Sequence, residues 1–276
     1  MQKLQRTIFS VLILFLLLLA TYVVVILYPE VLWFKSFGYD NIWWFTFKSK
    51  WFTFITFFVT AFVFLFLNVT VAKRVSEKNY STENLTFNTP FAVLNQFFEQ
   101  LLQQNKAQSQ LPLRIYYFFL NALILFFAVV FGLLAKSWWQ DIYAYIHQVA
   151  FQVTDPLFQQ DLSFYFFSLP FFEGLQAWAM GLCILTLGVV GWIYFSKNIL
   201  VLIFSTSPKI GHLKRHVFLL LSIGLFVYSL GIWFDVYQLL YSGRGIGFGA
   251  GYTDIHVFLY YLKGLFGLFL RSEEPT

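Results

Sequence analysis

Long uninterrupted runs of apolar residues constrain this chain more than any other feature of its sequence. Five such runs cover residues 7–28, 51–72, 115–135, 174–195 and 217–234, and no charged residue interrupts them. A helix rises 1.5 Å per residue, so about 20 residues cross the roughly 30 Å of hydrocarbon in a bilayer. We therefore expect an integral membrane protein.

A sixth apolar run, at 255–270, is shorter and contains Lys263. With this run included, the sequence predicts an all-α polytopic transmembrane helix bundle of about six spans. We expect a single integral membrane domain over residues 1–276. Composition agrees, since 59% of residues are hydrophobic and only 11% are charged, which excludes a soluble globular domain and intrinsic disorder.

Basic residues indicate the orientation of the spans. Lys3 and Arg6 precede the first run, which resembles a signal peptide but is too long and has no small-residue cleavage site after it. If the amino terminus is placed in the cytoplasm, most of the Lys and Arg residues fall in segments on the cytoplasmic side, as the positive-inside rule requires. We therefore expect a protein of a bacterial inner or internal membrane, with both termini on the cytoplasmic side. The net charge of +5 is then a topology signal, and nucleic-acid binding is not expected.

The segment after the second run predicts an amphipathic helix on the cytoplasmic side. Asn88-Thr89-Pro90 is typical of a helix start, and apolar residues recur at helical spacing over 91–102. Such a helix lies in the membrane interface or packs on the protein's own spans, and the sequence does not decide between them.

The three outer loops are rich in aromatic residues and turn formers, and we expect them to be ordered. In the second loop a surface helix is predicted from 141 to 153, while Asp155 before Pro156 and Asp161 are typical of N-caps. In the third, glycine occupies every second position from 243 to 251. No Gly-Lys-Ser/Thr follows, so close backbone packing is favoured over nucleotide binding.

These loops also carry a family resemblance. The segments are WFKSFGY at 33–39, DPLFQQDLSFYFFSLPF at 155–171 and LLYSGRGIGFGAGYTDIH at 239–256. They resemble Uncharacterised Protein Family zero-one-eight-two, a group of large bacterial multi-pass membrane proteins. The resemblance implies a cell-membrane location, an amino-terminal bundle of about seven spans and no known activity. Typical members continue into a long extracytoplasmic region, so we expect either a short relative or part of a longer protein.

Few polar residues are candidates for a site. Arg244 can hold an anionic headgroup or pair with Asp235 or Asp254, and Lys263 either extends toward the inner surface or marks an ion pathway. Lipid or partner contacts are also expected from the loop aromatics, of which three are singled out as candidates: Trp33, Tyr39 and Tyr252.

The remaining acids and histidines point to no reaction. Asp155, Asp161, Asp235 and Asp254 can form a cluster suited to acid–base work or Ca²⁺, but caps and turns are favoured. The four histidines form no HExxH motif, and a zinc site is not expected. His216 and His256 lie at span ends, where tetrapyrrole ligation competes with an ordinary interface role.

We therefore expect no cofactor, no bound metal and no catalytic residue. The sequence favours a non-enzymatic structural, scaffold or accessory subunit that contacts membrane lipids and other membrane protein subunits. A transport or lipid-handling module is the alternative, and an outer-surface enzyme ranks third. A polar cavity reaching mid-membrane would favour transport, whereas a dry interior would favour the scaffold.

Overall fold

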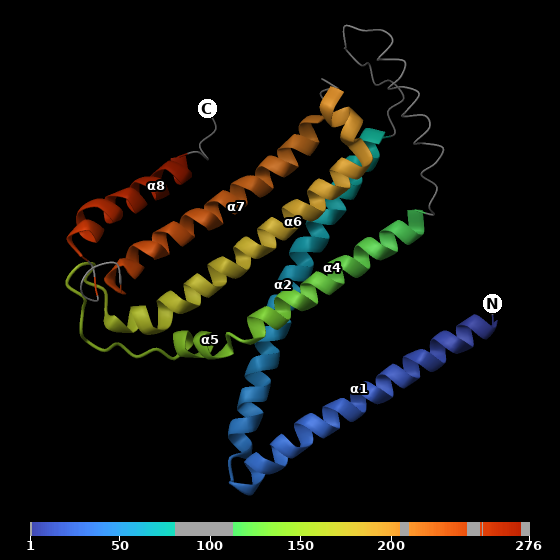
Figure 1. Ribbon diagram of the computed structural model, residues 1–276, viewed down its shortest axis with the longest axis horizontal. Helices are drawn as coiled ribbons and strands as arrows, with labels where there is room; N and C mark the ends of the chain where they lie inside the picture. The colour runs from blue at the N-terminus through green and yellow to red at the C-terminus, as the bar shows by residue number, and fades with distance from the viewer. Residues whose placement is uncertain (1, 81–112, 205–209, 242–248, 250, 272–276) are drawn as a thin grey trace. The chain divides into compact units, whose positions relative to one another are not determined.

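The computed structural model describes residues 2–80, 113–204, 210–241, 249 and 251–271, and every regular element in them is helical (Figure 1). The prediction of an all-α fold is confirmed. In chain order the elements are α1 (Gln2–Ser36), α2 (Asp40–Tyr80), α4 (Leu113–Lys136), α5 (Trp139–Ile146), the π-helix η1 (Phe164–Ser168), α6 (Leu169–Phe204), α7 (Ile210–Gln238), the 3-10 helix η2 (Leu239–Tyr241), the π-helix η3 (Asp254–Phe258) and α8 (Leu259–Arg271).

The chain divides into two compact units, Met1–Phe52 and Thr53–Thr276, called unit 1 and unit 2 below. Unit 1 contains α1 and the start of α2. The turn between them depends on Gly38, whose φ of +75° suits glycine, and the Tyr39 amide closes the turn by donating to the Phe34 carbonyl over 2.9 Å. The predicted single domain over the whole chain stays a prediction.

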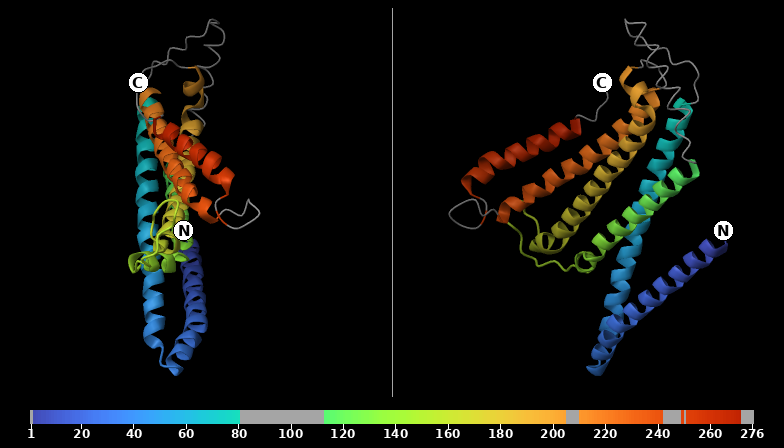
Figure 2. Two further views of the ribbon diagram at one scale, coloured as in Figure 1. Left: turned by 90° about the vertical axis from the view of Figure 1, so that its left-hand side faces the viewer. Right: turned by 45° about the vertical axis from the view of Figure 1, so that its right-hand side comes forward.

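Unit 2 is built around one apolar core to which α2, α4, α6 and α7 all contribute. Figures 1 and 2 show α6 and α7 side by side. Along each helix the buried residues are mostly three, four, seven or eight positions apart, which is the spacing of one helix face. They are Ala61, Leu65, Val69, Ala72, Leu120, Ile124, Ala128, Ala135, Trp178, Leu182, Val190, Ile193, Tyr194, Leu213 and Leu220.

Small residues let α2 and α4 approach closely. A Cβ built on Gly132 would lie 2.9 Å from Phe54 Cε2 and 2.9 Å from Phe58 Cβ, which is closer than two carbon atoms normally come. Membrane helices favour such contacts because lipid tails are as apolar as side chains, so tight packing drives association.

Two polar side chains of α6 donate to the backbone of neighbouring helices. The indole Nε1 of Trp178 on α6 donates to the Phe131 carbonyl of α4 over 3.0 Å. Gln176 Nε2, also on α6, donates to the Val227 carbonyl of α7 over 3.1 Å. These bonds join α6 to both neighbours and give each side chain a partner in an apolar setting.

Within the described residues, four helices are long and apolar enough to span a membrane, rather than the six predicted: Asp40–Ser76, Tyr117–Lys136, Phe164–Phe195 and Gly211–Gln238. The prediction at 255–270 is corrected, because α8 has only 13 residues, roughly 20 Å of helix, after a separate π-turn. Residues 7–28 are helical within α1, but many of their side chains lie outside the described part. The predicted helix at 91–102 also lies outside it.

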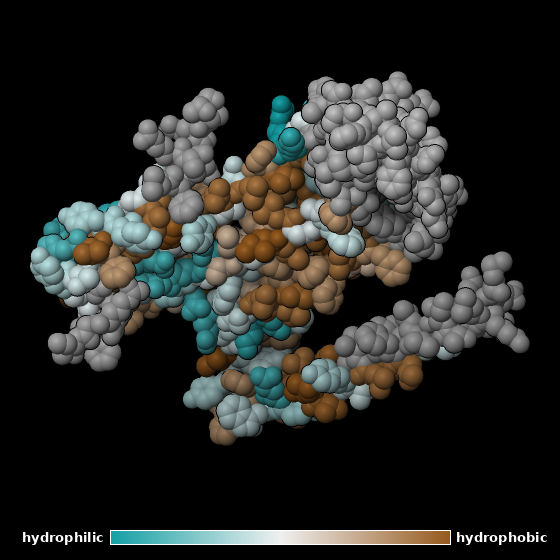
Figure 3. Space-filling model, turned by 45° about the horizontal axis from the view of Figure 1, so that its top comes forward, coloured by the Kyte–Doolittle hydropathy of each residue, from teal (hydrophilic) through white to brown (hydrophobic). Residues whose placement is uncertain are grey.

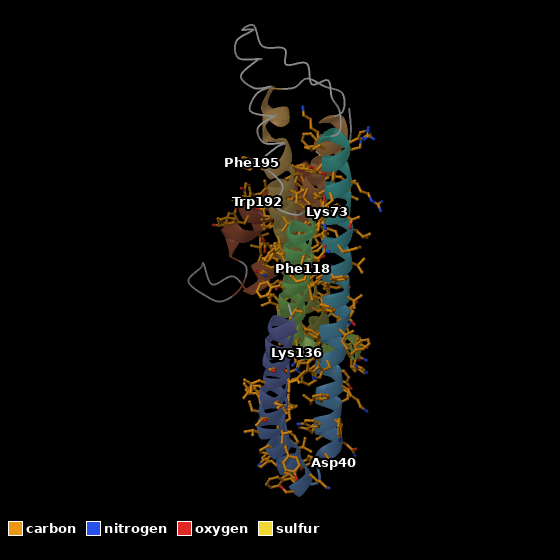
Figure 4. All side chains as sticks on the ribbon, turned by 90° about the vertical axis from the view of Figure 1, so that its right-hand side faces the viewer. Asp40, Lys73, Phe118, Lys136, Trp192 and Phe195 are labelled. Carbon is orange, nitrogen blue, oxygen red and sulfur yellow. The ribbon has the colours of Figure 1, made fainter. Side chains whose placement is uncertain are left out.

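The surface of unit 2 matches a membrane setting. Figure 3 shows apolar residues over much of the visible face of its long helices. Figure 4 shows Trp192 and Phe195 projecting from α6, and both are exposed, as is Phe118 on α4. Exposed large apolar side chains along helices of this length indicate contact with lipid.

Gly132→Ala is expected to lower the free energy of unfolding by about 1–3 kcal/mol, because the added methyl group must displace two packed phenylalanines. Gly188→Ala is the matched control, since its Cβ would meet nothing within 4 Å. That variant should be unchanged or up to about 1 kcal/mol more stable, from helix propensity alone. Equilibrium unfolding in detergent measures both, and equal effects would contradict the close α2–α4 contact.

Candidate functional site

The loop between α5 and α6 contains a turn built around the carboxylate of Asp155. Its Oδ1 accepts hydrogen bonds from the amides of Leu157 and Phe158 over 2.8 and 2.6 Å, and its Oδ2 accepts from the Gln160 amide over 2.9 Å. Pro156 has no N–H to compete and holds its own φ near the value that a turn needs. The Asp-Pro pattern therefore makes a tight turn rather than the start of a helix.

The fourth donor to Asp155 comes from a helix. The hydroxyl of Tyr165, in η1, donates to Asp155 Oδ2 over 2.6 Å. Asp155 is only 4% exposed and Tyr165 6%, so a charge is taken out of water at this point. A buried carboxylate is tolerated when donors surround it, and here four do.

Asp161 closes the same loop from its other end. Its carboxylate accepts from the amides of Phe151, Gln152 and Ser163 over 3.0, 2.8 and 2.8 Å. The bond from Ser163 has the geometry of an N-cap, and the helical run begins at residue 162, so the predicted cap at Asp161 is confirmed. We call residues 151–163 the carboxylate turn.

The backbone of the carboxylate turn is strained at two positions. Gln152 and Gln159 have φ of 60° and 56°, in the left-handed backbone region that residues other than glycine and asparagine rarely adopt. Each such residue costs of order 1 kcal/mol. The amide of Gln152 donates to Asp161 and that of Gln159 to the Asp155 carbonyl over 3.1 Å, so the hydrogen bonds offset this cost.

Both carboxyl groups are held in the ionised form. Burial raises the pKa of Asp155, but the bonds from Phe158, Tyr165, Gln160 and Leu157 together outweigh it, so that the pKa lies below its usual value. The side-chain and backbone bonds from Ser163 are the main cause that lowers the pKa of Asp161 to about 2. Neither acid therefore carries a proton to donate at neutral pH.

The carboxylate turn packs on the end of α7. The ring of Tyr237 lies 5.1 Å from that of Phe158 and 5.1 Å from that of Phe164, centroid to centroid. Phe158 also contacts a small apolar cluster of Val236, Leu239 and Leu259, which joins α7 to α8. The turn is thus attached both to its own helix and to a neighbouring one.

Apolar side chains are exposed around this fixed turn. Val149 is 72% exposed and Phe166 67%, and the Phe151 ring lies 5.9 Å from that of Phe166. We call the exposed apolar side chains of this region the loop patch. It consists of Ile146, Val149, Phe151, Val153 and Phe166.

The predicted surface helix at 141–153 is wrong in its extent. The observed helix, α5, ends at Ile146. The amides of Phe151 and Gln152 point to Asp161 instead of continuing a helical ladder, and the positive φ of Gln152 is incompatible with one. The bonds to Asp161 therefore exclude a helix at residues 151 and 152.

The structure does not assemble the candidate residues of the sequence into one site. Trp33 and Tyr39 are exposed in unit 1, and Tyr252 is exposed in unit 2, with its ring 4.2 Å from that of His256. Asp235 on α7 and Lys263 on α8 are exposed and form no ion pair within the described residues. Arg244 and the side chain of Asp254 lie outside the described part. All seven stay predictions.

His216 is engaged in a polar chain between helices. Its Nε2 lies 3.1 Å from Asn68 Oδ1 on α2, and its Nδ1 lies 2.8 Å from the Tyr194 hydroxyl on α6. Asn68 Nδ2 donates to the Phe64 carbonyl over 2.8 Å. Asn68 Oδ1 can only accept a hydrogen bond, so His216 Nε2 donates to it. His216 Nδ1 then accepts from the Tyr194 hydroxyl. Both ring nitrogens are thus occupied, which favours the ordinary interface role over tetrapyrrole ligation.

Sequence reasoning missed this chain and the role of Tyr165. Asn68 and His216 are 148 positions apart, and no local pattern marks either as the other's partner. The one signal was that both are polar residues near the ends of apolar runs. No group of three or more metal-binding side chains occurs among the residues that the structure describes.

Comparison with known proteins gives one consistent family. The family model described as Uncharacterised protein family (UPF0182) matches residues 7–272. A UPF0182 protein of Trichodesmium erythraeum is 26% identical over 252 residues, which cover 88% of this chain and 25% of the relative. One of Synechococcus sp. (strain JA-3-3Ab) is 38% identical over 126 residues, 44% of this chain and 14% of the relative.

The chain thus spans a quarter or less of the length of these two relatives. No solved structure shows significant similarity to it.

Asp155→Asn is expected to lower the free energy of local opening of the carboxylate turn by about 1–3 kcal/mol, because an amide NH₂ replaces an oxygen that accepts from buried donors. Faster hydrogen exchange of the amides at 157–160 measures the effect. Asp141→Asn is the control, since Asp141 is exposed on α5. Equal exchange in both variants would contradict the anchoring role of Asp155.

Acid should release the amides that Asp161 holds. Its pKa is lowered from 3.8 to about 2, so its contribution to stability is present above about pH 4 and is lost as the pH falls through about 2. We expect protection of the Gln152 amide, corrected for intrinsic exchange, to fall over this window. Asp161→Asn should remove the pH dependence, and its persistence in that variant would assign it to another group.

Proposed function

The chain belongs to the Uncharacterised protein family (UPF0182), and on this premise we propose that it is a non-enzymatic membrane scaffold whose loop patch binds a partner protein. It is a multi-pass helical protein with four candidate spans in its described part. The proposed partner is a protein surface with exposed apolar residues, on another membrane subunit or elsewhere in a longer family polypeptide. A bacterial inner or internal membrane, with both termini in the cytoplasm, is part of the proposal.

The observation that carries this proposal is a fixed apolar surface on a loop. The loop patch is attached to the carboxylate turn, and the two carboxylates accept seven hydrogen bonds from the chain. An ordered surface loses little conformational entropy when it binds, so its exposed area contributes more fully to affinity. A loop that served only as a connection would not need this degree of order.

The state of the two acids supports a non-enzymatic role. Asp155 and Asp161 are two of the four acids that the sequence offered for acid–base work, and both are ionised and surrounded by backbone donors. A general acid needs a pKa near the working pH, and a cation ligand needs free lone pairs. Their geometry suits an anchor better than either task.

The interior of unit 2 favours a scaffold over a transporter. Its core is apolar, and no charged side chain is buried within the described parts of the candidate spans. Transporters usually carry polar groups or broken helices near mid-membrane. Lipid handling, the other half of the alternative, has one observation in its favour, a groove at the opposite end of the unit.

Site-specific photo-crosslinking in native membranes tests the scaffold role. A benzophenone amino acid replaces Phe151, and we expect a discrete protein adduct because this residue lies in the loop patch. Phe118 is the matched control, since it is also an exposed phenylalanine but lies on the candidate span Tyr117–Lys136. It should give mainly lipid adducts.

The same probe in an Asp155→Asn background adds a second readout. The adduct at 151 should weaken, because the turn that presents the loop patch is loosened. Lipid adducts alone at both positions would overturn the proposal and place the loop patch in the membrane interface.

A further inference from the structure

A groove of about 540 Å³ lies between α2 and α7, at the end of unit 2 away from the carboxylate turn. We call it the basic groove, and this end of the unit the basic end, because Lys73, Arg74, Lys214 and Arg215 lie there. Figure 4 places Lys73 toward this end of α2. The volume is in the range of sites that enclose much of a small organic ligand.

The walls of the basic groove change character along its length. Leu67, Val71 and Leu219 line the part nearer mid-span. The part nearer the helix ends is lined by Arg74, Val75, His212 and Arg215. Leu67 and Arg74 are seven residues apart on one helix face, which is roughly 10 Å along the axis. The groove therefore suits an amphiphile with its charged end outward and its apolar end toward the membrane centre.

Two further polar side chains of the groove are already engaged in hydrogen bonds within the protein. Asn68 and His216 also line it, and they are engaged with each other, with Tyr194 and with the Phe64 carbonyl. This chain holds α2 and α7 at a fixed separation. The polar groups left to recognise a ligand are then the two guanidinium groups and the His212 imidazole.

The two arginines have no acidic counterpart in the part of the chain that the structure describes. Arg74 and Arg215 are exposed, and neither forms an ion pair or hydrogen bond with a described residue. Lys73, by contrast, donates to Asn121 Oδ1 over 3.1 Å and lies over the Tyr117 ring. Guanidinium groups match the geometry of a phosphate, and basic residues at a span end attract anionic lipid.

We propose that the basic groove binds one anionic phospholipid, with its phosphate on Arg74 and Arg215 and an acyl chain along Leu67, Val71 and Leu219. Charge complementarity selects an anionic headgroup over a zwitterionic one. The apolar wall distinguishes a lipid from free phosphate. The site is separate from the loop patch, so the proposal stands or falls independently of the scaffold role.

Binding of a fluorescent phosphatidylglycerol to the purified 276-residue chain in detergent tests the headgroup contact. Arg215→Gln should weaken binding about fivefold, the value of one basic residue at a membrane surface, and Arg74→Gln likewise. Lys214→Gln is the matched control, because Lys214 is adjacent, exposed and equally charged but does not line the groove. It should change affinity less than about twofold.

Val71→Trp tests the acyl contact while leaving both arginines in place. Val71 is partly exposed, so the indole can enter the groove without disturbing the core. Lipid binding should be lost with the melting temperature unchanged. Phosphatidylcholine and inorganic phosphate at the same concentration should fail to compete with the labelled lipid.

Three outcomes would overturn the proposal. Equal losses in Arg215→Gln and Lys214→Gln would mean general surface electrostatics, and unchanged binding in Val71→Trp would mean that no chain enters the groove. Full competition by inorganic phosphate would make the site one for a free anion. A failure of crosslinking at Phe151 would change none of these binding measurements, so the two proposals fail separately.

Discussion

A backbone that crosses hydrocarbon must satisfy its own N–H and C=O groups, and the described part of this molecule is organised by that requirement. The requirement makes the spans helical and restricts polar side chains to positions where a partner exists. Trp178 and Gln176 donate to carbonyls of α4 and α7, and the Thr186 hydroxyl donates to the Leu182 carbonyl of its own helix. Polar side chains such as Trp178 and Gln176 therefore add hydrogen bonds between helices, while Thr186 is satisfied within its own helix.

Close packing follows from the same setting. Between helices in lipid there is little hydrophobic driving force, so association depends on contact area and on short approach. Ala61, Ala72, Ala128 and Ala135 are fully buried, and Gly132 meets two phenylalanine side chains. Trp178 and Tyr194 lie in the core, but no phenylalanine of the described part is fully buried, and many are exposed where the lipid accepts any apolar shape. The abundance of phenylalanine therefore reflects the lipid around the helices more than the packing of the core.

Sequence reasoning succeeded where the signal was local and failed where it was not. The runs at 51–72, 115–135, 174–195 and 217–234 were located correctly because a span is a property of consecutive residues. The helix predicted at 141–153 was too long, and part of the reason is that Asp161 takes the amides of Phe151 and Gln152 from ten and nine positions away. The basic groove depends on α2 and α7 meeting, and periodicity reports which face is buried but not against what.

The charged groups at the two ends of unit 2 differ in whether the described part of the chain supplies their hydrogen-bond partners. At the carboxylate turn, seven donors surround two acids, so the charges serve the fold and the surface they present is apolar. At the basic end, the polar chain through Asn68, His216 and Tyr194 is complete without the arginines, which remain exposed beside an apolar wall. A guanidinium group at the edge of a membrane keeps a phosphate within reach whenever the chain supplies no carboxylate. The two proposals therefore place apolar recognition at one end of unit 2 and anion recognition at the other.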